Sequence, residues 1–239
     1  MSEMKTVLIT GATSGIGLET ARYLHRRGDY RLVLVGRNEA KLTELSNELK
    51  GELFFSCDLE ETEKIKELFT FIQAKELKMD GMVHAAGFAA NMPIKSLKMG
   101  LAEKQMRLHY YAFLELCKYF YSKKISNEGA SIVAMSSLAT ETKLKGSVMY
   151  VSSKSALNAA VSIASKEFLR RSIRVNALMP AYVDTRMNDG LEDLIDIKEK
   201  QPMGLIPPCS IADTIEFLLS DRSKYITGIC LPISAGMEF

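Results

Sequence analysis

The chain has 239 residues, of which 47% are hydrophobic, and its formal net charge at pH 7 is +2. This length and composition allow a sizeable hydrophobic core and predict a single domain over residues 1–239. The nearly balanced charge argues against nucleic acid or an anionic membrane surface as a partner.

Short apolar runs alternate with amphipathic stretches along the whole chain. The helical pattern is clearest in residues 18–27, 39–49 and 62–75, where apolar side chains recur at helical spacing. This alternation predicts an α/β fold of Rossmann type, a doubly wound parallel sheet of about seven strands with helices on both faces. The predicted strands are 6–10, 32–35, 53–57, 81–85, 131–136, 174–179 and 229–233.

The first predicted strand leads into a glycine-rich turn that opens a helix. Gly11 allows a tight turn, Gly15 a close approach of the backbone to a pyrophosphate, and Gly17 close packing of the helix on the strand. The positive end of the helix would then face a phosphate. The spacing G-x-x-x-G-x-G is a weak signal alone, because any strand-to-helix turn can carry three glycines, and it gains weight from the residues described below.

The end of the second predicted strand indicates which nicotinamide cofactor fits. Enzymes that use NAD usually place a carboxylate there for the ribose 2′-hydroxyl, but this chain has Gly36. Arg37 follows, and its guanidinium suits a 2′-phosphate. The sequence therefore favours NADP(H) over NAD(H), the alternative being that Arg37 is a solvated surface residue.

Tyr150 and Lys154 lie four residues apart, thirteen residues after Ser137. On a helix, residues at this spacing share one face, so an ammonium beside the phenol would lower the pKa of the phenol. Such a phenol can exchange a proton with a carbonyl or alcohol oxygen. Because the motif residues follow predicted strands, we expect them to meet at the carboxyl edge of the sheet, where ligands bind.

Together these motifs resemble the short-chain dehydrogenase/reductase family over nearly the whole chain, nearest to members similar to 3-oxoacyl-acyl-carrier-protein reductase. The segment 57–59 resembles the family's adenine contact, His84 opens a segment similar to its Asn-Ala-Ala-Gly, and 174–185 is similar to the segment that closes over the nicotinamide. The resemblance implies that these residues bind the cofactor: Gly11, Thr13, Ser14, Gly15, Ile16, Gly17, Arg37, Asn38, Asp58, Leu59, Ala85, Ala86, Gly87, Tyr150, Lys154, Pro180, Val183 and Thr185.

The same resemblance implies catalytic roles. Ser137 would donate to the substrate oxygen, Tyr150 would be the general acid, and Lys154 would lower the pKa of Tyr150 and hold the nicotinamide ribose. The family's fourth catalytic residue, an asparagine that holds a relay water, falls on His109. An imidazole can hold a water and titrate near neutral pH, but a satisfied core histidine is an equal alternative.

The implied function is NADPH-dependent reduction of a ketone or a 3-oxoacyl thioester to the alcohol. The alternative is a non-catalytic NADPH-binding regulatory protein of the same fold. An acyl carrier protein is a candidate partner, because Arg171 and the flanking Arg170 match a basic position of such reductases. The other basic position falls on Glu128, with Lys123 and Lys124 nearby, so only half of the patch is present.

Within the single domain, we expect a dinucleotide-binding half over roughly residues 1–130 and a catalytic and substrate half over 131–239. Residues 186–208 are a candidate substrate lid, because a polar stretch there precedes a group of prolines. The family resemblance also implies a homodimer or homotetramer, paired through long helices around 98–122 and 150–168.

The location is predicted to be cytoplasmic, with no membrane association. No apolar stretch approaches the length of about 18 residues that suggests a membrane span, and an apolar strand begins too early for a signal peptide. The four cysteines lack C-x-x-C spacing, which favours reduced thiols. The three histidines are unclustered, so no metal site is expected.

Overall fold

The computed structural model describes residues 4–185, 187, 197 and 199–239. A seven-stranded sheet in the order β3-β2-β1-β4-β5-β6-β7 forms its centre, and every strand pair is parallel. The predicted α/β class with seven strands is therefore confirmed. The strands are β1 (Lys5–Thr10), β2 (Tyr30–Gly36), β3 (Leu53–Ser56), β4 (Met79–His84), β5 (Ser126–Met135), β6 (Arg174–Pro180) and β7 (Cys230–Ile233).

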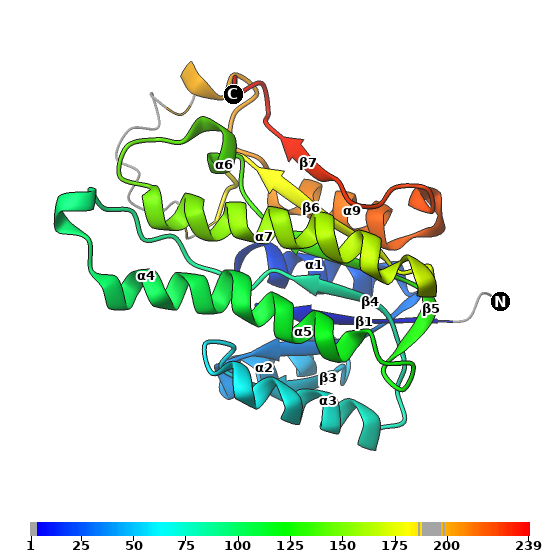
Figure 1. The fold of residues 1–239 in the computed structure, drawn as a ribbon. Helices are drawn as coiled ribbons and strands as arrows, with labels where there is room; N and C mark the ends of the chain where they lie inside the picture. Colours follow the sequence, from blue (N-terminus) through cyan, green and yellow to red (C-terminus); the bar gives the residue numbers. More distant parts are fainter. Residues whose placement is uncertain (1–3, 186, 188–196, 198) are drawn as a thin grey trace.

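Helices cover both faces of the sheet (Figure 1). One face packs against α3 (Ile65–Ala74), α5 (Ala112–Phe120) and α7 (Val148–Glu167), and the other against α1 (Gly15–Arg27), α2 (Glu39–Glu48) and α9 (Pro208–Leu219). The remaining described elements are short: η1 (Thr62–Lys64), η2 (Ile94–Ser96), α4 (Met99–Met106), η3 (Arg107–Tyr111), α6 (Ala139–Thr142), η4 (Phe168–Arg171) and η6 (Asp221–Ser223).

Alternating side chains of the central strands divide the core between the two faces. In β1, Leu8 packs with α3 and α5, whereas Val7 and Ile9 pack with α1 and α9. All three are buried, as expected for a strand covered on both sides. The apolar runs of the sequence therefore correspond to strands that have helices above and below them.

The strand order creates the crevice in which ligands bind such sheets. β1 pairs with β2 on one side and with β4 on the other, so the connections that leave β1 and β4 diverge. The two turns nevertheless approach closely, since a Cβ atom on Gly11 would lie 2.7 Å from the backbone nitrogen of Ala86. Gly11 also has a φ of +68°, so this position needs glycine for two reasons.

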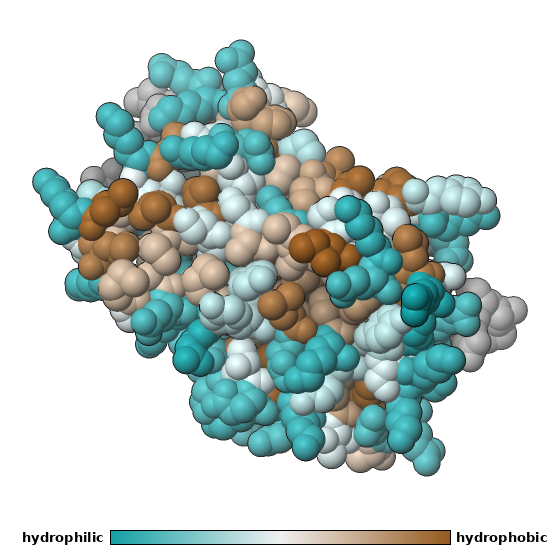
Figure 2. Space-filling view, in the orientation of Figure 1, coloured by the Kyte–Doolittle hydropathy of each residue, from teal (hydrophilic) through white to brown (hydrophobic). Residues whose placement is uncertain are grey.

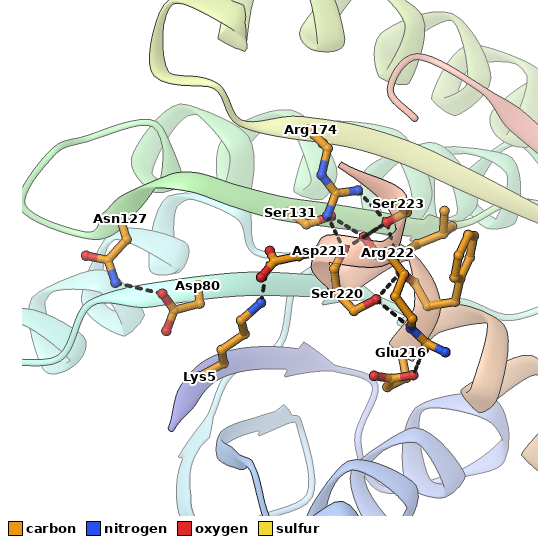
Figure 3. Close-up of polar contacts among 12 residues, drawn as sticks. Lys5, Asp80, Asn127, Ser131, Arg174, Glu216, Ser220, Asp221, Arg222 and Ser223 are labelled. Carbon is orange, nitrogen blue, oxygen red and sulfur yellow. Dashed lines mark hydrogen bonds and ion pairs between the residues drawn. The ribbon is translucent and has the colours of Figure 1, made fainter. Parts of the chain in front are cut away.

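Polar contacts fix the amino ends of the strands, away from this crevice (Figure 3). Arg174, at the start of β6, donates to the Ser223 hydroxyl at 2.9 Å and to the Ser220 carbonyl at 3.1 Å. The Ser131 hydroxyl of β5 donates to the carbonyl of Leu218 at 2.7 Å. These bonds hold the end of α9 against β5 and β6, so the opposite edge of the sheet is left for the motif residues.

The structure differs from the sequence prediction in several local features. β5 begins at Ser126 rather than at 131, and the predicted division of the chain near residue 130 falls inside this strand. η3 is a π-helical turn that links α4 to α5, and helical periodicity does not reveal such a turn. Of the predicted lid 186–208, residues 186, 188–196 and 198 lie outside the described residues. The single-domain assignment stays a prediction.

None of the helices in the described part of the chain is long and apolar enough to cross a membrane. The described residues also contain no group of three or more His, Cys, Asp or Glu side chains arranged to hold a metal ion. All four cysteines are free thiols, and Cys57 and Cys117 are buried.

Arg171 is buried rather than available to a partner. Its guanidinium donates to the carbonyl of Tyr121 and to both the hydroxyl and the carbonyl of Ser126, the latter two at 2.9 and 2.7 Å. Only 8% of the residue is exposed. The expectation that Arg171 forms part of a basic docking patch is therefore wrong, because its donors are used to connect η4 to the start of β5.

Arg171→Ala is expected to lower the free energy of unfolding by about 3 kcal/mol, since it leaves buried oxygen atoms without donors. Urea denaturation measures the change. Arg170→Ala is the matched control, because Arg170 is exposed on the same turn and should change stability little. Equal, small effects of the two substitutions would contradict the structural role of Arg171.

Candidate active site

A cavity of about 1030 Å³ opens at the carboxyl edge of the sheet. It brings together residues from the first turn of α1, the segment after β4, the segment after β5, and α7. The predicted site residues in its lining are Gly11, Ser14, Gly15, Ile16, Ala85, Ala86, Gly87, Ser137, Tyr150, Lys154, Pro180, Val183 and Thr185. Thr13, Gly17, Arg37, Asn38, Asp58, Leu59 and His109 are not among the described residues that line it.

Tyr150 and Ser137 form a hydrogen-bonded pair on the cavity wall. Ser137 follows the end of β5, and Tyr150 lies in the first turn of α7. Burial raises the pKa of Tyr150 above its ordinary value, and the hydrogen bond with Ser137 opposes this rise only in part. The phenol therefore keeps its proton at neutral pH and has that proton available for transfer.

Lys154 is buried one helical turn after Tyr150. Its Nζ atom donates to the carbonyl of Met135 at 2.7 Å and lies 5.9 Å from the centre of the Tyr150 ring. Burial lowers the pKa of Lys154 to about 7. The expected lowering of the Tyr150 pKa by this ammonium is not found here, because the ammonium is directed at a carbonyl and burial of the phenol dominates.

Both ring nitrogens of the fully buried His109 are engaged by protein groups. Ser153 donates its hydroxyl proton to the Tyr150 carbonyl, so its oxygen accepts from Nδ1 of His109, at 2.8 Å. Nε2 accepts from the backbone N–H of Phe88 at 3.2 Å, which assigns the proton to Nδ1.

These contacts correct the relay role expected for His109. With Nδ1 and Nε2 both occupied, no ring nitrogen remains to hold a water. Burial and the nearby Lys154 hold the pKa of His109 far below its ordinary value, so the ring is neutral rather than titrating near pH 7. The ring lies 5.8 Å from that of Tyr150, in an edge-on arrangement. The geometry favours a residue that positions its neighbours.

The side chains of Gln105 and His109 both hydrogen-bond to the backbone of Phe88. The sequence analysis did not predict this contact. The side-chain amide of Gln105 donates to the Phe88 carbonyl at 3.4 Å, while His109 accepts from its N–H. Phe88 in turn lines the cavity. The spacing of four residues between Gln105 and His109 was the available signal, because such residues share one face of a helix. This spacing does not identify a backbone segment as their partner.

His84 supports the same π-helical turn from the sheet. Its Nδ1 accepts from the Thr10 hydroxyl at 3.0 Å, and its Nε2 donates to the Leu108 carbonyl at 3.2 Å. Burial lowers the pKa of His84 to about 3, so this ring is neutral too. The residue links β1 and β4 to η3, next to His109.

The start of α1 suits a phosphate group. Its first turn contains no acidic residue, and Ser14 makes no side-chain capping bond to it. A Cβ atom on Gly17 would lie 2.3 Å from the Gly11 carbonyl oxygen, which confirms close contact between helix and turn. Ser14, Gly15 and Ile16 line the cavity at the positive end of this helix, where the first backbone N–H groups have no intrahelical partner.

The residues predicted to bind the adenosine end are not in the lining of this cavity. Arg37 is exposed, and its guanidinium lies 3.9 Å from the carboxylate of Glu60. Asn38 caps α2 through Lys41, Asp58 accepts from the backbone of Glu60, and Leu59 is buried. A Cβ atom on Gly36 would lie 3.2 Å from the Thr13 side chain, so Thr13 occupies part of the space that a carboxylate there would need.

Two cavity features had no clear sequence signal. The Ser136 hydroxyl is buried in the lining and has no hydrogen-bond partner, whereas the Ser137 side chain contacts Tyr150. Residues 236–239 also line the cavity, although nothing in their sequence places them there. An unpartnered buried hydroxyl in the lining is a donor that a bound molecule can use.

Comparisons with known proteins agree with this geometry. A family model described as enoyl-(acyl carrier protein) reductase matches residues 11–238. A 3-oxoacyl-[acyl-carrier-protein] reductase FabG from Rickettsia felis is 32% identical, over 98% of this chain and 96% of that protein. A human 3-oxoacyl-[acyl-carrier-protein] reductase is 28% identical, over 98% of each chain.

Solved structures share the fold. A short-chain dehydrogenase/reductase of Brucella melitensis matches with a TM-score of 0.92 at 22% identity, covering 99% of this chain and 98% of that one. A blue fluorescent protein from a metagenomic library, solved in complex with NADPH, matches with a TM-score of 0.90 at 21% identity, covering 98% of each chain.

His109→Leu is expected to lower the free energy of unfolding by about 1–3 kcal/mol, because the N–H of Phe88 loses its acceptor. Turnover should fall because Phe88 and Ser153 lose their common anchor, but the shape of the pH profile should not change. His109→Asn keeps a donor and an acceptor, and should retain more activity. Loss of an ionisation between about pH 5 and 8 in both variants would instead show that His109 titrates.

Lys154 should make the stability depend on pH. Since its pKa falls from the ordinary 10.5 to about 7 on folding, the unfolded chain binds more protons between these values. The stability contribution of Lys154 therefore rises with pH across this window. Relative to a Lys154→Met variant, the unmodified protein is expected to become more stable from about pH 7 to about pH 9 in urea denaturation. A constant difference would contradict the lowered pKa.

Proposed function

The chain belongs to the short-chain dehydrogenase/reductase family, a family of oxidoreductases, and we propose that it reduces a ketone or a 3-oxoacyl thioester to the alcohol with NADPH. The observation that carries this proposal is the hydrogen-bonded pair of Tyr150 and Ser137 on the wall of a large cavity, with buried Lys154 one turn away. The relatives' names favour the 3-oxoacyl thioester.

In the proposed reaction, a carbonyl oxygen of the substrate lies against Ser137 and Tyr150. A bound nicotinamide supplies the hydride. The hydroxyl of Ser137 orients the oxygen, and Tyr150 gives its proton to the alkoxide as charge develops. The raised pKa of Tyr150 suits this direction, because the phenol is protonated before reaction. Lys154, in the same lining, would hold the nicotinamide ribose.

NADPH is the proposed cofactor because of the end of β2. Gly36 provides no carboxylate for a ribose hydroxyl, and Arg37 provides a cation. The pairing of Arg37 with Glu60 is long and largely exposed, and ion pairs of this kind contribute little. The guanidinium is therefore free to turn to a 2′-phosphate, whose charge and geometry it matches better.

The proposed substrate has an apolar part. Phe88, Leu138, Leu144, Met187 and Met237 line the cavity beside the polar pair. Such a wall suits an acyl chain better than a sugar. An acyl carrier protein remains the proposed macromolecular partner, and a cytoplasmic location remains a sequence-based part of the proposal.

A homodimer or homotetramer is also proposed. Tyr111, Leu114 and Ile163 are 49%, 40% and 56% exposed and come from η3, α5 and α7, within the segments expected to pair. Apolar side chains gathered on one face are typical of a subunit interface.

The non-catalytic alternative is less well supported than the enzyme. A regulator that only binds a cofactor has no need of a proton donor, yet Ser137, Tyr150 and Lys154 are retained together. Their burial and mutual contacts on the cavity wall support the proposed acid better than a set of unrelated surface residues.

Tyr150→Phe is expected to lower the turnover of a 3-oxoacyl thioester by about 10²-fold or more, since the general acid is lost. Cofactor binding should change little, because a single hydroxyl is removed. The loss of NADPH absorbance measures the turnover of this variant, of a control variant and of the unmodified protein. Tyr225→Phe is the control, since Tyr225 is 88% exposed and outside the cavity. Near-normal turnover by Tyr150→Phe would overturn the mechanism.

Arg37→Ala is expected to weaken NADPH binding by about tenfold or more and to leave NADH binding almost unchanged, because only NADPH carries the 2′-phosphate. Titration of each cofactor by fluorescence gives the dissociation constants. Arg31→Ala, which removes an exposed arginine from β2, the strand that precedes Arg37, is the control. If the unmodified protein binds the two cofactors equally, Arg37 is only a surface charge.

A further inference from the structure

The surface that a carrier protein would need is not where the family resemblance places it. Arg171 is buried with its donors occupied, and the second expected basic position is the exposed Glu128. If the protein accepts a carrier-bound thioester, as proposed above, its docking surface must therefore be sought elsewhere near the cavity.

Two segments at the mouth of the cavity carry lysines and no carboxylates. Residues 91–98, after β4, include Lys95 and Lys98, and residues 143–148, before α7, include Lys143 and Lys145. All four lysines are exposed. None of them has an ion-pair partner within the described chain, whereas Lys64 and Lys118 each pair with a glutamate at 2.6 Å. The charges of these four lysines are therefore not neutralised by ion pairs within the described chain, although Glu141, Glu199 and Glu238 also line the active-site cavity.

The two segments form one surface. The backbone N–H of Met92 donates to the carbonyl of Gly146 at 2.7 Å. A second hollow of about 310 Å³ lies between Ile94 and residues 143–148. Leu144, Lys145 and Ser147 line both this hollow and the active-site cavity. A molecule seated in the hollow is thus adjacent to the cavity that contains Tyr150.

The centre of this surface is apolar. Ile94, Leu144 and Val148 are 73%, 46% and 37% exposed, and all three line the second hollow. Figure 2 shows hydrophobic side chains at the left end of the molecule, where η2 and the start of α7 lie in Figure 1, with hydrophilic side chains around them. An exposed apolar centre with a charged rim is the composition of a protein–protein interface.

We propose that Ile94, Lys95, Lys98, Lys143, Leu144 and Lys145 form the docking surface for an acidic carrier protein that presents its thioester to Tyr150 and Ser137. This inference rests on the proposed function. Charge complementarity carries it, because a cluster of unpaired lysines attracts and orients a partner with surface carboxylates. The hollow and the cavity share Leu144, Lys145 and Ser147 in their linings, so a partner seated in the hollow would lie close to the active-site cavity.

The test compares two substrates with the same 3-oxoacyl group, one attached to an acyl carrier protein and one to N-acetylcysteamine, which has no carrier. The variant Lys95→Glu/Lys143→Glu reverses two charges that lie outside the active-site cavity. We expect KM for the carrier-bound substrate to rise about tenfold or more. This KM should also depend less on salt concentration than the KM of the unmodified protein does. Both kinetic constants for the carrier-free substrate should stay unchanged, which also shows that the variant is folded.

Lys123→Glu/Lys124→Glu is the matched control, with two exposed lysines reversed near Glu128. It should leave the carrier-bound KM unchanged. An unchanged KM in Lys95→Glu/Lys143→Glu, or an increase in the Lys123→Glu/Lys124→Glu control instead, would overturn the docking surface and leave the proposed reduction standing. An equal loss of activity with the carrier-bound and the carrier-free substrate would also overturn the docking surface. Failure of the unmodified protein to reduce either substrate would overturn the proposed function itself.

Discussion

The hydrogen bond from the buried Lys154 ammonium to the Met135 carbonyl joins α7 to the last residue of β5. Because Ser137 follows that strand and Tyr150 lies one turn before Lys154, this bond fixes the distance between serine and tyrosine. There is little spare volume around it: a Cβ atom on Gly87 would lie 3.5 Å from the ammonium and 3.0 Å from Nε2 of His109. A side chain at residue 87 would press against the His109 ring, so glycine suits the close meeting of the segment after β4, η3 and α7.

Two neutral histidines, His84 and His109, stabilise this arrangement through hydrogen bonds between elements. His84 ties the π-helical turn to β1, and His109 ties it to Phe88 and to Ser153 on α7. Burial keeps the pKa of each ring below its ordinary value, so each ring donates through one nitrogen and accepts through the other. A protonated ring would lose its acceptor and disrupt the contact. These histidines act as fixed connectors between elements, which leaves the proposed proton transfer to Tyr150.

Much of the fold and part of the site could be predicted from the sequence, because they depend on local patterns. Apolar runs identified the seven strands, and their carboxyl ends placed Gly11, Gly87 and Ser137 along one edge. Contacts between distant segments could not be predicted in this way. The burial of Arg171, the partners of His109 and the meeting of residues 91–98 with 143–148 all depend on how elements pack, and no spacing along the chain encodes them.

The central claim is that this cavity reduces a carbonyl group with NADPH, and isotope transfer tests it most directly. The unmodified protein is incubated with a 3-oxoacyl thioester and with NADPH that carries deuterium at its reactive nicotinamide carbon, on the face from which it is transferred. Mass spectrometry of the product is expected to find one deuterium on the new carbinol carbon. Substrate recovered unchanged, with NADPH not consumed by this thioester or by a panel of ketones, would contradict the account.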